Sequence, residues 1–180
     1  MYCCIHCLTG KEPEAASSIE RLFHQNGMDD TIVWFPKKVT RLRVKGKISE
    51  EMRPLFPGYI FFFFGYEQDA LPAFDIRRTP FVVRILTYGD GTIDLRGPDL
   101  SVAKWIHRNG GDIAISKVVY NPGEKLHIID GPMQGLDALV VKVDRHKKKV
   151  WVSFDLDGIM NKVSFDVDFL QGGGASKLPY

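Results

Sequence analysis

The sequence lacks the features that mark membrane and secreted proteins. It has no apolar run approaching the ~20 residues that a membrane-spanning helix needs. Its start has no basic segment followed by an apolar one, the pattern of a secretion signal. We therefore expect a cytoplasmic protein without membrane contact.

The sequence also lacks an excess of either charge. Its 180 residues include 24 basic and 22 acidic side chains, for a formal net charge of +2. A balance of this kind creates no field that would draw the whole chain to nucleic acid. Any nucleic-acid binding must come from local clusters of cations.

Motifs of catalysis are missing as well. The chain has no Walker loop, no dinucleotide fingerprint and no zinc-binding helix motif, and its five histidines are scattered. Asp155 and Asp157 alternate along one strand, as do Asp166 and Asp168, so each pair shares a strand face. An acidic face that balances a basic tip explains them better than a catalytic pair, and we expect neither an enzyme nor a cofactor.

Three cysteines lie in the segment CCIHC, at Cys3, Cys4 and Cys7. With His6 they raise the possibility of a metal site, but no second cluster of Cys and His completes four ligands. In a strand, Cys4 and Cys7 point to opposite faces. We expect buried, reduced thiols and no metal.

Hydrophobic periodicity and turn residues predict the remaining elements of the first half. Thr9 is expected to cap the first helix with Glu12 in a capping box, and Asp99 to cap the last. The predicted strands are 2–8, 30–36, 59–64 and 81–88, and the predicted helices are 9–27, 66–80 and 97–110.

The segment LFPGYIFFFF, residues 55–64, concentrates aromatic side chains. A turn at Pro57 and Gly58 leads into a strand that is apolar on both faces, which predicts a central strand covered on both sides. Phe56 precedes the turn and belongs to no alternation. It can be a plug of the core or an exposed anchor for a protein partner.

Two basic segments stand out from the balanced whole. Residues 37–53 hold seven basic and two acidic side chains and are expected to form a mobile β-hairpin, either a solvated loop or a basic finger that touches phosphates. The second segment, 142–152, places its cations at a hairpin tip near Trp151. Its candidate RNA-binding residues are Lys142, Arg145, His146, Lys147, Lys148 and Lys149. The alternative is a solubilising turn with Trp151 in the core.

Residues from about 112 onward form short alternating strands with turns at Pro122-Gly123, Asp130-Gly131 and Asp157-Gly158. They predict a small antiparallel barrel.

Four motifs together resemble the NusG family of transcription elongation factors in order and spacing. They are IHCLTGKE (5–12), LFPGYIF (55–61), RRTP (77–80) and NPGEKLHIIDGPMQGLDALVVKVD (121–144). The resemblance implies an α+β fold, with an antiparallel sheet flanked by helices in an N-terminal NGN-type domain and a C-terminal all-β KOW barrel. The implied domain bounds are 1–108, a linker 109–117, the barrel 118–171 and a flexible tail 172–180.

The resemblance also implies that the protein binds RNA polymerase and DNA. The protein itself is expected to be a monomer. The residues matching the family's contact with the clamp helices of RNA polymerase are Phe56, Pro57, Gly58 and Tyr59. The residues matching the contact with non-template DNA are Arg77, Arg78 and Thr79.

Departures from the family pattern are expected to matter for function. Arg78 stands where members usually have Asn, and Phe81 where a Gly is common. Asp157 occupies an aromatic position that general members use to bind a ribosomal protein or the Rho factor. These departures indicate a specialised paralogue similar to LoaP antiterminators, which engage structured nascent RNA. The alternatives are a general NusG and a ribosome-associated KOW protein that binds RNA.

Overall fold

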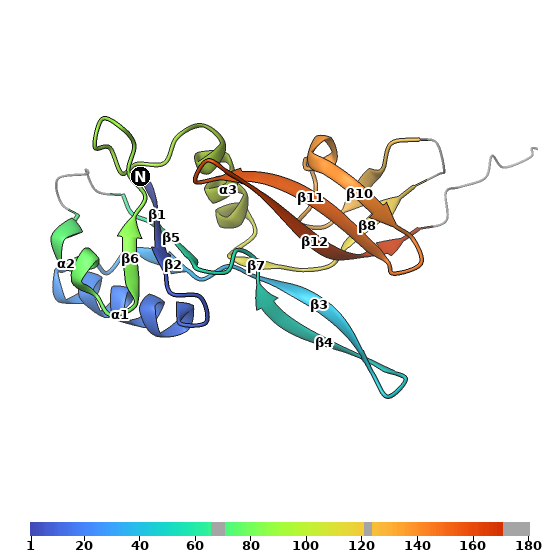
Figure 1. The fold of residues 1–180 in the computed structure, drawn as a ribbon, viewed down its shortest axis with the longest axis horizontal. Coiled ribbons are helices and arrows are strands. Elements are labelled where there is room, and N and C mark those ends of the chain that lie inside the picture. The colour runs from blue at the N-terminus through green and yellow to red at the C-terminus, as the bar shows by residue number, and fades with distance from the viewer. Residues whose placement is uncertain (66–70, 121–123, 171–180) are drawn as a thin grey trace, which may run out of the picture. The chain divides into compact units, whose positions relative to one another are not determined.

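A computed structural model describes residues 1–65, 71–120 and 124–170, and it confirms the expected α+β class (Figure 1). The predicted tail 172–180 and the Pro122-Gly123 turn lie outside these residues.

The helices are α1 (Glu12–Gln25), α2 (Ala73–Arg78), α3 (Gly97–Arg108) and the short 3-10 helix η2 (Asp137–Leu139). The first strands are β1 (Tyr2–Cys7), β2 (Ile32–Trp34), β3 (Lys37–Val44), β4 (Lys47–Pro54), β5 (Tyr59–Phe63) and β6 (Val82–Ile85). The later strands are β7 (Asp112–Ile113), β8 (Ser116–Val119), β9 (His127–Asp130), β10 (Val140–Asp144), β11 (Lys149–Leu156) and β12 (Ile159–Phe169).

The described chain forms two compact units that each draw on separate stretches of sequence. The first consists of Met1–Lys37, Arg53–Ile113 and Asp155–Ile159. The second consists of Lys38–Met52, Ala114–Phe154 and, among the described residues, 160–170.

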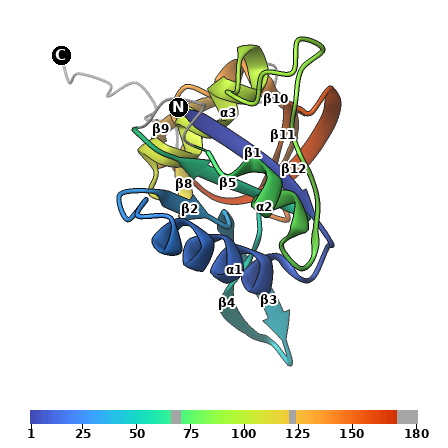
Figure 2. The same ribbon diagram turned by 90° about the vertical axis from the view of Figure 1, so that its left-hand side faces the viewer.

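The first unit is built on a four-stranded sheet in the order β2-β5-β1-β6. Strand β5 pairs antiparallel with both β1 and β2, and β1 pairs antiparallel with β6. The predicted central position of the phenylalanine-rich strand is therefore confirmed. Helices α1 and α3 lie on opposite faces of this sheet (Figure 2).

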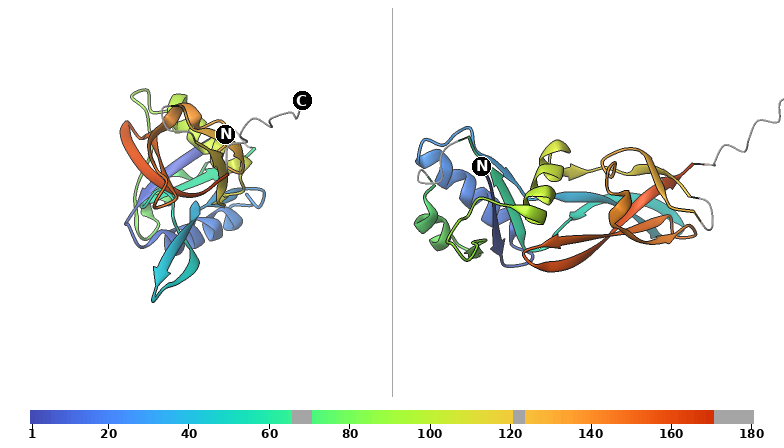
Figure 3. Two further views of the ribbon diagram at one scale, coloured as in Figure 1. Left: turned by 90° about the vertical axis from the view of Figure 1, so that its right-hand side faces the viewer. Right: turned by 90° about the horizontal axis from the view of Figure 1, so that it is seen from above.

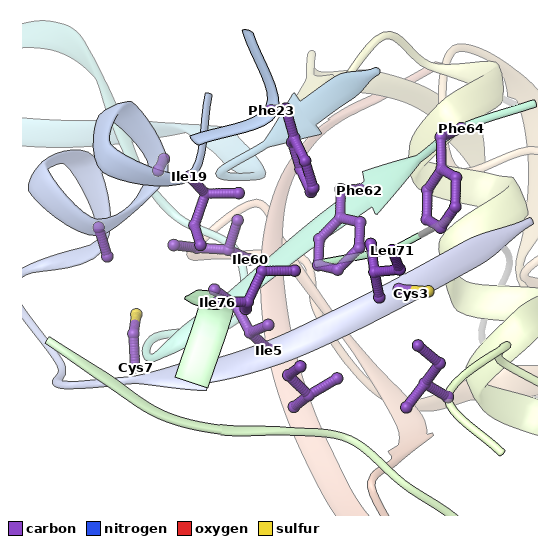
Figure 4. Packing of buried hydrophobic residues seen from close by; sticks show 14 of the residues in the cluster. Cys3, Ile5, Cys7, Ile19, Phe23, Ile60, Phe62, Phe64, Leu71 and Ile76 are labelled. Atoms are coloured by element: carbon purple, nitrogen blue, oxygen red, sulfur yellow. The ribbon is translucent and has the colours of Figure 1, made fainter. Parts of the chain in front are cut away.

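Both faces of β5 are covered, as its sequence predicts. On one face Ile60, Phe62 and Phe64 pack with Ile19 and Phe23 of α1 in a single buried cluster (Figure 4). On the other face Phe56 and Phe61 contact each other, and the ring of Phe63 lies 4.9 Å from that of His107 in α3. Phe61–Phe64 thus contribute side chains to the apolar layers on both faces of the sheet.

The predicted helix caps are wrong. Helix α1 has Lys11 at its N-cap position and α3 has Arg96, and neither cap residue makes a side-chain hydrogen bond to its helix. Thr9 lies too far upstream to cap α1. The Glu12 carboxylate accepts the amides of Gly10 and of the distant Gly58, and the Asp99 carboxylate accepts the Tyr88 hydroxyl and the Asp157 amide. The predicted stops at Gly27 and Gly110 fit, since both have positive φ, at 69° and 67°.

All three cysteines are buried as free thiols, which confirms the expected burial. Cys3 and Cys7 join the cluster beneath α1, whereas Cys4 lies outside that cluster, as alternation along a strand requires. Burial raises the pKa of each thiol, to about 11 for Cys7. The thiols are therefore protonated and unreactive near neutral pH.

Strands β3 and β4 form the predicted hairpin, seen in cyan and teal in Figure 3. Its turn residues Lys45 and Gly46 both have positive φ, at 49° and 80°. Two consecutive residues of this kind make a tight turn whose twist matches a regular two-stranded ribbon.

The second unit contains a five-stranded sheet in the order β10-β11-β12-β8-β9. The prediction of a wholly antiparallel barrel is wrong in one pair, because β12 runs parallel to β8. These strands are separated by most of the barrel sequence, so a long connection replaces the short hairpin that antiparallel neighbours use. Across the residues that the structure describes, no helix is long and apolar enough to cross a membrane.

We predict that Phe62→Ala lowers the free energy of unfolding by about 3–5 kcal/mol, because it removes a fully buried ring. Phe74→Ala is the matched control, since the Phe74 side chain is 66% exposed while that of Phe62 is 0% exposed. Chemical denaturation of the full chain measures both. Equal effects of the two variants would contradict the packing at β5.

Candidate partner and nucleic-acid surfaces

A buried carboxylate holds the turn between β4 and β5. Glu12 Oε1 accepts a hydrogen bond from the Gly58 amide and Oε2 accepts one from the Gly10 amide, both at 2.8 Å. The carbonyl of Gly58 in turn accepts from the Cys7 amide at 2.8 Å. Gly58 has φ of +85°, and a Cβ there would lie 3.2 Å from the Cys7 carbonyl oxygen. The turn therefore requires glycine for both its conformation and its neighbours.

The residues predicted to contact polymerase divide by burial. Pro57 is exposed, whereas Gly58 and Tyr59 are buried. Phe56 is only 2% exposed, and its ring centre lies 6.4 Å from that of Phe61. Of the two alternatives for Phe56, the structure places it as a plug of the core.

The hydroxyl of Tyr59 points into a polar network within the first unit. It donates a hydrogen bond to Asp157 Oδ2 at 3.2 Å, and the same oxygen forms an ion pair with Arg84. The Asp157 amide donates to Asp99 Oδ1 at 2.8 Å, and Asp99 Oδ2 accepts from the Tyr88 hydroxyl at 2.7 Å. Asp157 is thus a partly buried carboxylate whose Oδ2 is shared by a guanidinium and a hydroxyl.

This network alters the acid–base behaviour of its tyrosines. Burial, together with the charge and hydrogen bond of Asp157, raises the pKa of Tyr59 to about 12. Burial and the hydrogen bond to Asp99 raise the pKa of Tyr88 to about 12. Neither tyrosine ionises at neutral pH, so both remain hydrogen-bond donors.

The sequence did not reveal this network. Asp99 was expected to cap a helix, and Arg84 had no expected role. The Asp-Gly turn at 157–158 was visible as a turn, and Asp157 has φ of +59°. Nothing in local spacing connects it to Tyr59, 98 positions away.

The residues predicted to contact DNA lie at the end of α2. Arg77 and Arg78 are exposed, and the Arg78 guanidinium lies 5.0 Å from the centre of the Phe74 ring. Thr79 is half-buried, and its hydroxyl donates to the Asp75 carbonyl at 3.0 Å. The two arginines are available to a phosphate, while the threonine hydroxyl is used within the helix end.

The turn after these arginines carries a strained residue. The Val82 amide donates to the Thr79 carbonyl at 3.2 Å, and Phe81 has φ of +70°. A turn of this kind normally places glycine at that position. Phe81 is instead an exposed aromatic, with the Lys11 ammonium 5.4 Å from its ring centre.

The six residues predicted to bind RNA do not form one uniform tip. Arg145, His146, Lys147 and Lys148 lie exposed in the turn between β10 and β11. Lys149 is half-buried and its ammonium pairs with Asp166 at 2.9 Å.

The remaining candidate, Lys142, lies in β10 rather than in the turn. Its ammonium lies 4.8 Å from the centre of the Trp151 ring. Trp151 is half-buried, so it is neither a free stacking platform nor a core residue. The described residues contain no group of three or more His, Cys, Asp or Glu side chains placed to hold a metal ion.

Comparison with known proteins identifies the family. A family model described as "Transcription termination factor nusG" matches residues 2–100. The chain belongs to the NusG family. It is 27% identical to the Thermus thermophilus transcription termination/antitermination protein NusG, over 90% of this chain and 92% of that protein. It is 26% identical to the Escherichia coli protein of the same name, over 90% of each chain.

A solved structure titled "Domain interaction in Thermotoga maritima NusG" shares the fold with a TM-score of 0.54. That match is 17% identical and covers 91% of this chain and 92% of that one. It is consistent with an NGN-type domain followed by a KOW domain in this NusG-family chain.

We predict that Asp157→Asn lowers the pKa of Tyr59 from about 12 toward the ordinary value, because it removes one of the charges that oppose ionisation. The shift is partial, since burial is the largest cause and remains. A spectrophotometric pH titration measures the Tyr59 pKa, and the variants Tyr59→Phe and Tyr88→Phe assign the two raised transitions.

The raised pKa means that the stability contributed by Tyr59 is complete below about pH 10 and is lost as pH rises through about 12. An unchanged Tyr59 titration would show that Asp157 does not contact the hydroxyl in solution.

Proposed function

We propose that this NusG-family chain is a specialised transcription elongation and antitermination factor. Its N-terminal domain, 1–108, binds RNA polymerase, and its KOW barrel, 118–171, binds nascent RNA across a linker at 109–117. Because both binding sites are on one chain, formation of the first contact raises the effective concentration for the second. Two weak contacts therefore give a higher overall affinity than either gives alone. The factor has no catalytic role in this proposal.

The exposed cationic turn of the barrel carries the RNA part of the proposal. Arg145, His146, Lys147 and Lys148 follow one another without an intervening acid and are all exposed. The acid before the turn, Asp144, is engaged because its Oδ1 accepts the Lys147 amide at 2.9 Å. A cluster of this kind favours contact with a phosphate backbone.

The turn at residues 55–59 carries the polymerase part. In the family this turn meets the clamp helices, and Pro57 is exposed at its apex. Phe56 is covered, so a direct contact through its ring requires that the ring be uncovered when polymerase binds. The exposed guanidiniums of Arg77 and Arg78 support an added contact with non-template DNA.

Asp157 supports a specialised role over a general one. General members use an aromatic residue at this position to bind a ribosomal protein or the Rho factor. Asp157 instead accepts from Tyr59 and pairs with Arg84. A ribosome-associated RNA-binding protein is the alternative from another class, and binding to ribosomal RNA without binding to polymerase would favour it.

We predict that the full chain binds purified core RNA polymerase and that Pro57→Lys weakens this binding at least tenfold. Pro57 is exposed, so the substitution places a bulky charge at the proposed contact without opening the core. Biolayer interferometry with immobilised polymerase measures the affinities.

Two further variants interpret the polymerase experiment. Phe56→Ser tests the aromatic itself, and its thermal unfolding must be recorded because the residue is buried. Lys104→Glu, at an exposed position of α3, is a charge control. If the wild-type chain does not bind polymerase, the elongation-factor proposal fails and the ribosomal alternative takes its place.

We also predict that the double variant Arg145→Glu/Lys147→Glu weakens binding to a stem-loop RNA. Loss of two phosphate contacts reduces the slope of log affinity against log salt by about 2. The double variant Lys125→Glu/Lys162→Glu makes the same change of charge at exposed positions outside the turn. Fluorescence anisotropy at several salt concentrations measures both. A larger effect of the control would refute the turn as the RNA contact.

A further inference from the structure

The β3–β4 hairpin is attached to the barrel by a forked ion pair within the second unit. Arg41 of β3 donates from its two terminal nitrogens to the two carboxylate oxygens of Asp168 in β12, at 2.6 and 3.2 Å. Its third nitrogen donates to Glu50 of β4 at 3.0 Å. A bidentate guanidinium–carboxylate pair fixes orientation as well as distance. Arg41 therefore ties both strands of the hairpin to one residue of the barrel.

Further contacts extend this attachment along β12. The Lys38 ammonium donates to the Ser164 carbonyl, and the Arg41 amide donates to Asp166 Oδ2 at 3.3 Å. Asp166 is 4% exposed and also pairs with Lys149 at the start of β11. The paired carboxylates of β12 are thus structural links, in agreement with the expectation that they balance basic residues.

The cationic turn of the barrel adjoins the same end of β12. The Val167 amide donates to the Lys148 carbonyl at 2.9 Å, and the Arg145 guanidinium lies 6.0 Å from the centre of the Phe169 ring. Lys148 and Arg41 both contribute to lowering the pKa of Asp168. Asp168 therefore lies where the hairpin and the cationic turn meet.

The outer half of the hairpin has no covering layer. Residues 43–50 are all exposed, and they include Arg43, Lys45 and Lys47. The acid among them, Glu50, is engaged by Arg41. At ~3.3 Å per residue, the turn at Lys45 projects about 13 Å beyond Arg41. The hairpin is therefore an exposed cationic arm with the defined shape of a two-stranded ribbon.

We propose that the outer hairpin, residues 43–47, and the barrel turn, residues 145–148, are two arms of one surface that binds the sugar-phosphate backbone of folded RNA. The proposal rests on the proposed function and deepens it, because it adds a second RNA contact from a different part of the sequence. Asp168 holds the two arms together through Arg41.

Folded RNA fits this surface better than a single strand does. Single strands are bound by exposed aromatic side chains on which bases stack. Within the described part of the second unit, no aromatic residue is among the large exposed hydrophobics. The rings of Trp151 and Phe169 each lie beneath a cation, Lys142 and Arg145 respectively. Paired RNA is recognised through its phosphates and shape, which requires cations at separated points and no stacking platform.

The test uses the full chain and a generic stem-loop RNA, with an unpaired RNA strand and a DNA duplex as further probes. The double variant Arg43→Glu/Lys47→Glu reverses the charge of the hairpin arm, from +3 to −1 over residues 43–47, and keeps the Lys45-Gly46 turn. This hairpin variant is compared with the turn variant Arg145→Glu/Lys147→Glu and with a combined variant that carries all four substitutions. The control is Lys125→Glu/Lys162→Glu. Anisotropy across a salt series gives the affinity and the number of phosphate contacts, and circular dichroism confirms folding.

We expect the hairpin variant to weaken stem-loop binding at least tenfold and to reduce the salt slope by about 2, as the turn variant does. The combined variant should reduce the slope by about 4, and the control should leave it unchanged. Binding of the unpaired strand should be weaker from the outset.

Different outcomes separate this inference from the proposed function. If only the turn variant weakens RNA binding, the hairpin arm is refuted and the proposed function stands. If the hairpin variant loses polymerase binding but keeps RNA binding, the hairpin serves another partner and the inference fails. Equal binding and equal losses with the DNA duplex would refute a preference for RNA. If both arms bind RNA while the chain ignores polymerase, the inference survives and the elongation role does not.

Discussion

The burial of both faces of strand β5 is the constraint on which the first unit depends. Phe62 faces the layer under α1, and Phe63 faces the layer that contains His107 of α3. Neither layer can shift without disturbing the other, because the same backbone serves both. The turn at Pro57 and Gly58 precedes this strand. It is held by Glu12, whose carboxylate accepts a hydrogen bond from the Gly58 amide. The segment proposed to contact polymerase therefore leads into a central strand that is buried on both faces, which suits a surface that must be formed before its partner arrives.

Carboxylates fix several of the turns and edges in both units. Glu12 accepts two backbone amides, and Asp99 accepts the amide of Asp157 and the hydroxyl of Tyr88. In the second unit Asp168 accepts the guanidinium of Arg41. A buried or half-buried carboxylate is costly unless it is fully hydrogen-bonded, so each of these groups specifies one arrangement of its neighbours. The exposed turn at residues 145–148 is a contrasting segment, since its four cationic or ionisable side chains follow one another without an acid between them.

Local pattern was enough to predict the main elements and the class of fold, and long-range pairing was not. The central place of β5 followed from alternation of apolar residues, and the β3–β4 hairpin from alternation with a glycine. The helix caps failed because Glu12 bonds to Gly58, 46 positions away, and that partner has no local signal. The same holds for Arg41 and Asp168, 127 positions apart. Spacing identified the cationic turn correctly, but only tertiary structure could show that Lys149 is turned inward toward Asp166.

Each of the two units includes a short segment from the part of the sequence that mainly forms the other unit. The chain therefore cannot be divided by a single cut without separating residues of one unit. The segment Asp155–Ile159 belongs to the first unit, although the strands that carry it continue in the second. A cut after Ile113 would leave the Arg84 guanidinium, the Tyr59 hydroxyl and Asp99 Oδ1 without the partners that Asp157 supplies. The same cut would leave Arg41 in the first fragment and Asp168 in the other. Each fragment would thus expose polar groups whose partners are on the other fragment.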